Sequence, residues 1–176
     1  LFTQRDPQVN NPGLDDLYPV GTAAVVLKLI RQPNDTVTVI AHGLSRVRAT
    51  SAVQTTPFLR ANVEVLQEKT ERNRNLDAAF KTLTATANEL ISLSPTIPDQ
   101  MQTVVNNIEE PGQLADFLAA NLDATTEEKQ SLLDELNIAR RVRNVQVMLS
   151  RQVDIARLQQ KIQQDVQSTI TDSQRK

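Results

Sequence analysis

The sequence predicts an α+β fold, in which a β-rich first half is followed by a helical second half. Three of the four glycines and five of the eight prolines lie in residues 1–66, and neither residue type occurs after Gly112. Apolar and polar residues alternate in much of residues 36–66, whereas apolar residues recur at helical spacing after residue 72. We therefore expect a β-rich subdomain over residues 1–68 and helices from residue 72 onward.

Four short strands are expected in the first half, with a turn at residues 32–35 where Pro33 and Asn34 favour chain reversal. The second strand alternates strictly until His42-Gly43, which we interpret as a break before the third strand. A glycine at such a break suggests a β-bulge or a backbone angle that only glycine adopts easily. The predicted strands span residues 21–31, 36–41, 44–50 and 58–66. Consecutive short strands of this kind form a meander, either a small barrel or a curled sheet.

The second half is predicted to form a helical subdomain over residues 72–136 and a long helix over residues 137–176. Pro111 suits the first turn of one helix, and Thr125 with Glu128 has the spacing of a capping box for the next. Apolar stripes mark the first and last helices: Leu76, Phe80, Leu83, Ala87 and Leu90 in one, and Ile138, Val142, Val145, Leu149 and Val153 in the other, continued by Ile155, Leu158, Ile162, Val166 and Ile170.

The sequence predicts no catalytic site, no metal site and no bound cofactor. The chain contains no cysteine and one histidine, His42, so the common transition-metal sites and thiol chemistry are excluded. It also lacks a G-x-x-x-x-G-K-[ST] phosphate loop, a G-x-G-x-x-G loop and a G-x-S-x-G nucleophile elbow. No candidate nucleophile or acid is placed beside His42, so we interpret this residue as structural or merely exposed.

The charge distribution favours a protein partner over nucleic acid. The formal net charge is −2 and aromatic residues make up 3% of the chain, so bases would find few rings on which to stack. Residues 109–135 carry eight acidic groups against Lys129, and residues 140–161 carry six basic groups against Asp154. We interpret these runs as solvated faces, with acidic and basic helices side by side. No apolar run reaches the roughly 18 residues of a transmembrane helix.

Two segments resemble the N-terminal region of the Lon family of ATP-dependent proteases. "DLYPVGTAAVVLKLIRQPNDTVTVIAHGLSRVRA" (residues 16–49) is similar to the family's "YxVGTxAxI" strand, "PDGT" hairpin and "VxVEGLxR" strand at the same spacing. "EEPGQLADFLAANLDATTEEKQSLLDELNIARRV" (residues 109–142) resembles the family's "EDPxxLADxIAxxL" and "EKQxLLE" runs. Two departures are that His42 replaces the usual Glu, and that the family's first strand, "LPLRDxVVFPGxxxPL", is missing.

The resemblance implies a partial PUA-like β-barrel and a helical subdomain whose long C-terminal helix leads toward an ATPase module absent from this chain. It implies a substrate-recognition and assembly region that binds unfolded or tagged proteins, self-associates through the parent hexamer and does not itself cleave. ATP, magnesium and the Ser-Lys protease pair would belong to other modules. The implied location is the bacterial cytoplasm, with the mitochondrial matrix as the alternative.

Two aromatic residues are the candidate substrate contacts, because a recogniser of unfolded proteins needs apolar groups at its surface. Tyr18 precedes the first full strand and Phe58 follows Pro57, so both lie near strand ends, where the rim of a barrel forms. The alternative is that both rings belong to the core. Two other functions stay open: a stand-alone Lon-like domain acting as an adaptor or scaffold, and RNA binding. Because the chain begins with Leu, we expect it to be a piece of a longer protein.

Overall fold

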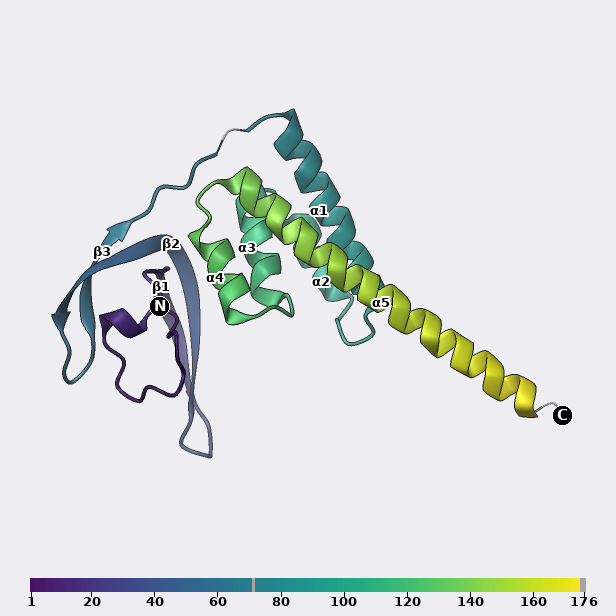
Figure 1. Ribbon diagram of the computed structural model, residues 1–176, viewed down its shortest axis with the longest axis horizontal. Helices are drawn as coiled ribbons and strands as arrows, with labels where there is room; N and C mark the ends of the chain where they lie inside the picture. Colours follow the sequence, from purple (N-terminus) through teal and green to yellow (C-terminus); the bar gives the residue numbers. More distant parts are fainter. Residues whose placement is uncertain (71, 175–176) are drawn as a thin grey trace. The chain divides into compact units, whose positions relative to one another are not determined.

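The computed structural model describes residues 1–70 and 72–174, with side chains described as far as Gln167. The chain divides into two compact units, Leu1–Glu68 and the part from Lys69 onward, which we call the sheet unit and the helical unit (Figure 1). The last two residues of the predicted long helix, Arg175 and Lys176, lie outside the described residues, as does the side chain of Ile170.

The sheet unit contains a three-stranded antiparallel sheet in the order β1-β2-β3. Its elements are a short 3-10 helix at Leu14–Asp16, β1 (Val20–Arg31), β2 (Val37–Gln54) and β3 (Arg60–Val65). The predicted turn at residues 32–35 joins β1 to β2, and Asp35 has a φ of 58° there. Asn34 holds the turn because its Oδ1 accepts hydrogen bonds from both the backbone N and the Oγ1 of Thr36.

The predicted strand break at His42-Gly43 is wrong, because β2 runs continuously through it and the sheet has three strands instead of four. Ala24 pairs with Gly43 and Ala23 pairs with Ser45, so Leu44 is the extra residue of a β-bulge. The bulge absorbs one residue without ending the ladder, and it moves the following side chains to the opposite face. Gly43 has no positive φ.

The core of the sheet unit is small. Its buried apolar side chains are Val20, Val47 and Leu66. Arg46 is also buried, and its Nη1 lies 2.8 Å from Oε1 of Glu68, which follows the last strand. Because the backbone N of Leu66 also donates to the Arg46 carbonyl, the segment after β3 is fixed to β2 at two points.

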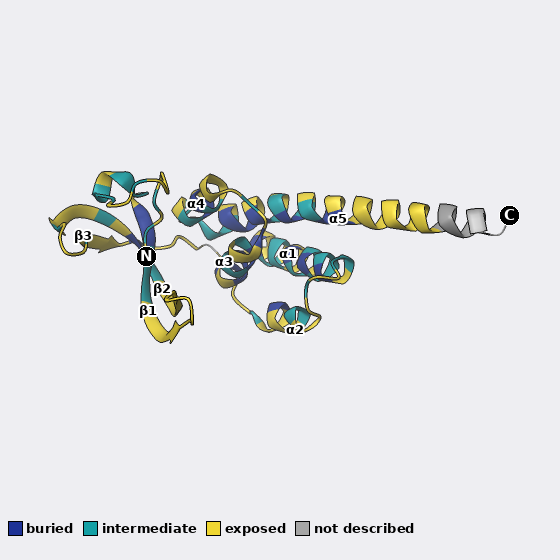
Figure 2. Ribbon diagram, turned by 90° about the horizontal axis from the view of Figure 1, so that it is seen from below, coloured by how far each residue is buried: buried dark blue, intermediate teal, exposed yellow. Residues whose placement is uncertain are grey.

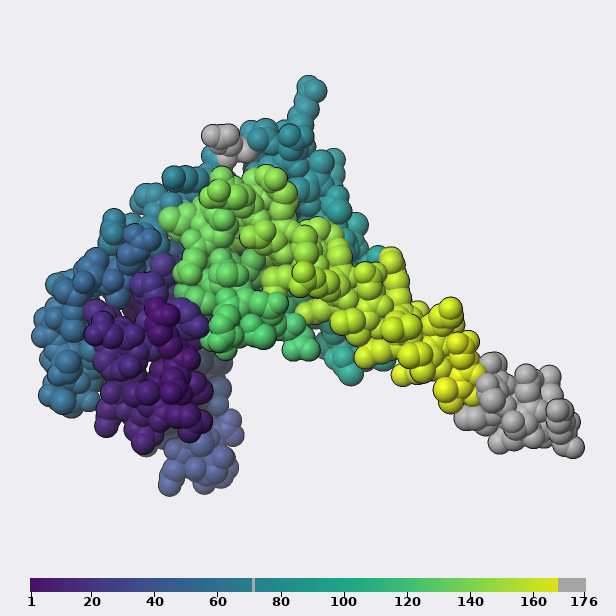
Figure 3. Space-filling model, in the orientation of Figure 1, coloured from purple at the N-terminus to yellow at the C-terminus, as the bar shows by residue number. Residues whose placement is uncertain are grey.

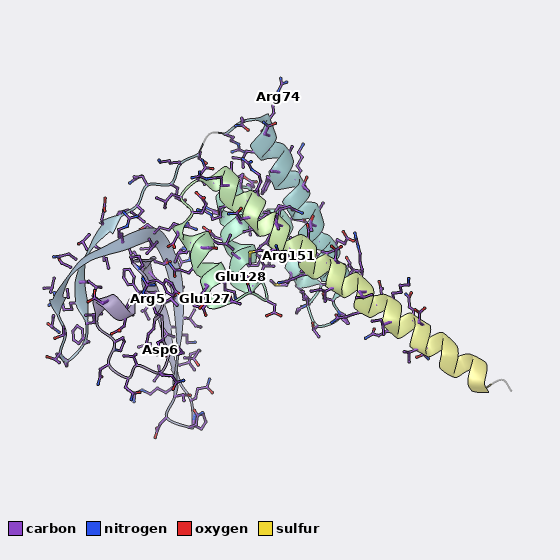
Figure 4. All side chains as sticks on the ribbon, viewed as in Figure 1. Arg5, Asp6, Arg74, Glu127, Glu128 and Arg151 are labelled. Atoms are coloured by element: carbon purple, nitrogen blue, oxygen red, sulfur yellow. The ribbon has the colours of Figure 1, made fainter. Side chains whose placement is uncertain are left out.

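The helical unit contains α1 (Arg74–Leu93), α2 (Gln100–Asn107), α3 (Pro111–Asn121), α4 (Thr126–Asp134) and α5 (Ile138–Gln174). Local signals begin these helices as predicted. Pro111 occupies the first position of α3. The capping box of α4 is confirmed: the Thr125 hydroxyl accepts from the Glu128 backbone N at 3.2 Å, and the Glu128 carboxylate accepts from the Thr125 backbone N at 2.9 Å. Glu128 is labelled in Figure 4.

One hydrophobic core joins the helices of this unit, with the buried residues on one side of α1 and of the first half of α5 (Figure 2). Three of the five predicted stripe positions in α1 are fully buried, and Phe80 and Leu90 pack at the margin. The buried cluster comprises Leu76, Leu83, Ala87, Ile91, Val105, Leu114, Ala115, Leu118, Leu122, Leu132, Val142, Val145 and Leu149.

The basic run at the start of α5 is not wholly the solvated face that the sequence suggested. Arg141 is fully buried, and its Nε lies 3.1 Å from Oδ1 of Asp116 on α3. Its Nη1 also donates to the carbonyl of Glu135 at 2.8 Å. The interpretation of acidic and basic helices side by side is therefore correct at α3 and α5, but one arginine of the run belongs to the interior.

Candidate functional site

Phe58 presents its ring to solvent. The residue lies in the loop between β2 and β3, and it is 63% exposed. Its carbonyl accepts a hydrogen bond from Nε2 of Gln54 at 3.1 Å, which fixes the backbone of the loop while leaving the ring outside. The alternative interpretation, that both candidate rings belong to the core, is therefore wrong for Phe58.

Tyr18 has different surroundings. It is half-buried, and the guanidinium of Arg5 lies 4.6 Å from the centroid of its ring. Arg5 is held in place because its Nε donates to the Leu17 carbonyl, and the Tyr18 backbone N donates to the Thr3 carbonyl. One face of the ring is thus occupied by a cation–π contact within the N-terminal segment. Tyr18 is a weaker candidate for an apolar contact than Phe58.

Most of the exposed large apolar residues of the sheet unit lie elsewhere, on residues 24–31 and 37–44, which we call the hairpin arm. β3 pairs only with residues of β2 from Val47 onward. Among the named strands, the two strands of the arm therefore pair only with each other. The exposed large aliphatic residues of the arm are Val25, Val26, Leu27, Leu29, Ile30, Val37, Val39, Ile40 and Leu44.

The ladder register assigns these side chains to two faces, because directly paired residues of antiparallel strands share a face. Leu29 pairs with Val39 and Val26 pairs with Ala41, so these residues share one face with Val37. Val25 pairs with His42, and Ile40 lies beside them on the other face. The first face is therefore apolar, whereas the second mixes aliphatic residues with Lys28, Thr38 and His42, and both faces are solvated.

Sequence reasoning missed the arm because "AAVVLKLI" (residues 23–30) was interpreted as an ordinary strand. The signal was available, since a run with almost no polar positions predicts a strand covered on both faces. In the sheet unit neither face of the arm is covered.

His42 lies in the middle of β2 with an exposed side chain. No cluster of three or more His, Cys, Asp or Glu residues that could hold a metal ion occurs in residues 1–70 and 72–174 as described. None of the described helices is long and apolar enough to cross a membrane.

The fold is that of the N-terminal domains of Lon proteases. The chain superposes on the N-terminal domain of a Lon protease of the Mycobacterium avium complex with a TM-score of 0.67 and 18% identity, over 79% of this chain and 74% of that one. A Lon N-terminal domain protein from Xanthomonas campestris gives a TM-score of 0.51 at 13% identity, over 76% and 70% of the two chains.

The chain belongs to the substrate-binding domain family of the ATP-dependent protease La (LON), whose family model matches residues 1–151. It is 35% identical to a Lon protease of Koribacter versatilis and 33% identical to one of Dictyoglomus thermophilum, each over 99% of this chain. Lon protease 2 of Myxococcus xanthus is 35% identical over the same share. The chain spans only 21–22% of the length of these relatives.

Proposed function

We propose that this chain is the substrate-recognition and assembly region of an ATP-dependent Lon-type serine protease that degrades misfolded and regulatory proteins. The observation that carries the proposal is the hairpin arm, an exposed aliphatic surface in a chain of a substrate-binding family. Contiguous exposed apolar surface marks a binding site in soluble proteins. Unfolded or tagged proteins are the proposed clients.

The physical basis of capture is the burial of aliphatic side chains. A two-stranded ribbon is marginally stable in water, so covering the arm with an apolar client segment would stabilise the ribbon and the complex together. The arm also carries Lys28 and Arg31 among its apolar residues and has no carboxylate, while Asp35 lies in the turn that joins its two strands. The proposed clients therefore combine aliphatic residues with neutral or acidic ones.

Replacing the paired residues Leu29 and Val39 with serine should weaken capture of a chemically unfolded model protein by about tenfold or more, since roughly two aliphatic contacts are lost. Because both side chains are more than half exposed, the midpoint of thermal unfolding should change little. Binding measured by fluorescence anisotropy, with the melting midpoint recorded alongside, tests both expectations. The matched control replaces Gln32 and Thr38, the polar pair at the arm's tip, with serine.

The same assay should distinguish between the two aromatic candidates, Phe58 and Tyr18. Phe58→Ser should weaken capture at an unchanged melting midpoint, whereas Tyr18→Ser should lower the midpoint by removing the ring beneath Arg5. Unimpaired capture by the Leu29/Val39 variant and by Phe58→Ser together would refute the proposed client surface.

The remaining parts of the proposal concern the parent protein. ATP and magnesium would bind to modules outside this chain, and the parent would assemble as a hexamer in the bacterial cytoplasm. Relatives about five times longer than this chain support the existence of such further modules.

The isolated chain should show neither ATPase nor peptidase activity, because the phosphate loop and the Ser-Lys pair would lie in those other modules. Phosphate release and cleavage of a fluorogenic peptide, both measured after repeated purification, are the appropriate assays. Turnover that follows the protein through each purification step, and is lost when the chain is unfolded, would contradict the proposal.

A further inference from the structure

A cavity of about 310 Å³, which we call the α1–α5 pocket, lies within the helical unit. It is found where the beginnings of α1 and α5 are side by side (Figure 3). All of its lining residues belong to this one compact unit, so the pocket does not depend on the sheet unit. They are Asn73, Asn75, Leu76, Ala79, Ala139 and Arg143. The volume is at the small end of the range for ligand pockets, which suits a short extended segment better than a folded partner.

The floor of the α1–α5 pocket is apolar. Leu76 is 3% exposed and belongs to the bundle core, and Ala79 and Ala139 pack against that core. The two alanines leave the space open, because nearby stripe positions of the same helices carry larger side chains, such as Leu83 and Val142. An aliphatic side chain placed on this floor would leave water without displacing any residue of the bundle.

The rim of the pocket carries one guanidinium, that of Arg143. Its Nε donates to the Ala139 carbonyl at 3.3 Å, which holds the group beside the floor. No ion pair involves Arg143 among the residues whose side chains are described. Carboxylates near the beginnings of these helices pair with other arginines: Asp77 and Glu110 with Arg72, and Glu135 with Arg140. The Nη groups of Arg143 are therefore available to an anion from outside.

The rest of the rim consists of two carboxamides. The Oδ1 of Asn73 accepts from the Leu76 backbone N at 2.9 Å and so caps α1. Because the end of the helix is already capped, the positive charge of the rim is that of Arg143. The exposed carboxamide of Asn75 forms no hydrogen bond with the described residues, and it can both donate to a carboxylate and accept from a peptide N–H.

We propose that the α1–α5 pocket binds the C-terminal residue of a client chain, an inference that rests on the proposed recognition function and gives it a second site outside the hairpin arm. The terminal carboxylate pairs with the two Nη groups of Arg143, whose spacing matches that of carboxylate oxygens. An aliphatic side chain on the same residue covers Leu76 and the two alanines. A chain terminus is suited to a small pocket because it is free to enter without unfolding the rest of the client.

Three fluorescein-labelled peptides of otherwise identical sequence test the ligand by fluorescence anisotropy. A peptide that ends in leucine with a free carboxylate should bind about tenfold more tightly than the same peptide with an amidated end. A third peptide, amidated but with glutamate before the leucine, should bind as weakly as the second, which separates a terminal carboxylate from a side-chain one. Equal binding of the first two peptides overturns the proposal, and so does tight binding of the third.

Substitutions of arginine locate the site. Arg143→Gln should abolish the preference for the free carboxylate, whereas Arg143→Lys should keep part of it, because lysine retains the charge without the planar fork. Arg74→Gln is the matched control, since this exposed residue of α1 points away from the bundle and does not line the pocket (Figure 4). An unchanged preference in Arg143→Gln, or an equal loss in Arg74→Gln, contradicts the proposed site.

Filling the floor tests the apolar half of the pocket. Ala79→Leu should weaken binding of the free-carboxylate peptide about fivefold or more, because the new side chain occupies the place of the ligand's own. The melting midpoint should not fall, since leucine is also a strong helix former. Unchanged binding in a folded Ala79→Leu variant contradicts the proposal. Equal binding of free and amidated peptides, with capture by the hairpin arm intact, refutes this site alone. Absent capture by the arm, with the peptide preference intact, refutes the proposed client surface alone.

Discussion

Replacing Arg141 with alanine should destabilise the helical unit by about 3 kcal/mol, one of the two largest effects expected of a single substitution in this chain. The guanidinium is fully buried and holds two groups at once, the Asp116 carboxylate on α3 and the Glu135 carbonyl before α5. Its removal leaves a cavity and deprives both acceptors of a donor. The Asp116 side chain is 41% exposed and can be rehydrated in part, which keeps the cost below that of a fully buried pair.

The neighbouring residue provides a matched control. Arg140 also forms an ion pair, at 3.0 Å to Glu135, but its side chain is 65% exposed. Arg140→Ala should therefore cost less than about 1 kcal/mol. Urea unfolding followed by circular dichroism at 222 nm reports on the helical unit, which contains α1 to α5. Equal losses for the two variants would show that the buried pair contributes no more than a surface one.

Arg141→Lys separates charge from geometry. Lysine keeps the positive charge but lacks the planar fork that reaches Asp116 and the Glu135 carbonyl from separate nitrogens. We expect it to recover less than half of the loss caused by alanine. A Cβ on Gly112 would lie 3.2 Å from Nη2 of Arg141, a tight contact that the guanidinium would have to relieve by a small shift.

Arg140 and Arg141 show which features of a side chain's environment cannot be predicted from the sequence alone. Adjacent residues on a helix differ by about 100° in direction, so one can be buried and the other solvated. Arg141 was predictable as interior only by noting that it lies three residues after Ile138 and four before Val145, at the margin of the apolar stripe. The identity of its acceptor was not predictable, because Asp116 is distant in sequence and is brought close only by the packing of α3 on α5.

In the sheet unit, too, some features could be predicted from the sequence and others could not. The turn at residues 32–35 followed from Pro33 and Asn34, whose local chemistry acts whatever the rest of the chain does. Gly43 suggested a β-bulge, and one occurs at the next residue, Leu44. The continuation of β2 through it did not follow from the sequence, because the sequence of one strand does not reveal its register. The exposure of Val26, Leu29 and Val39 likewise depends on β3 pairing only with the second half of β2.

In α5 the spacing of the apolar residues already indicated that the apolar stripe changes face along the helix. The last large core positions are Leu149 and Val153, four residues apart, and a two-residue step from there to Ile155 cannot stay on the same face of a helix. The first stripe meets the helices of its own unit, whereas the residues of the second are more than half exposed: Ile155, Leu158, Ile162 and Val166. The expectation of one continuous stripe along α5 is therefore wrong.

Gly21→Ala should destabilise the sheet unit by about 2–4 kcal/mol, the second large effect. Gly21 has no positive φ, so the constraint is close approach and not backbone conformation. A Cβ at this position would lie 2.2 Å from the Leu1 carbonyl oxygen and 2.5 Å from Cδ1 of Phe2. Neither contact can be relieved without moving the N-terminal segment away from β1. That movement breaks the two backbone hydrogen bonds between Leu1 and Thr22.

The other glycines of the sheet unit set a scale for this effect. A Cβ on Gly43 would lie 3.1 Å from Cγ2 of Thr22, a side-chain methyl that can shift, and one on Gly13 would lie 3.7 Å from Oδ2 of Asp16, an ordinary contact. The expected loss in stability on substitution by alanine therefore falls in the order Gly21, Gly43, Gly13. Tyr18 is the only tyrosine and tryptophan is absent, so intrinsic fluorescence during urea unfolding reports on the sheet unit alone. A loss at Gly43 as large as that at Gly21 would mean that the N-terminal segment does not pack against β1 as described.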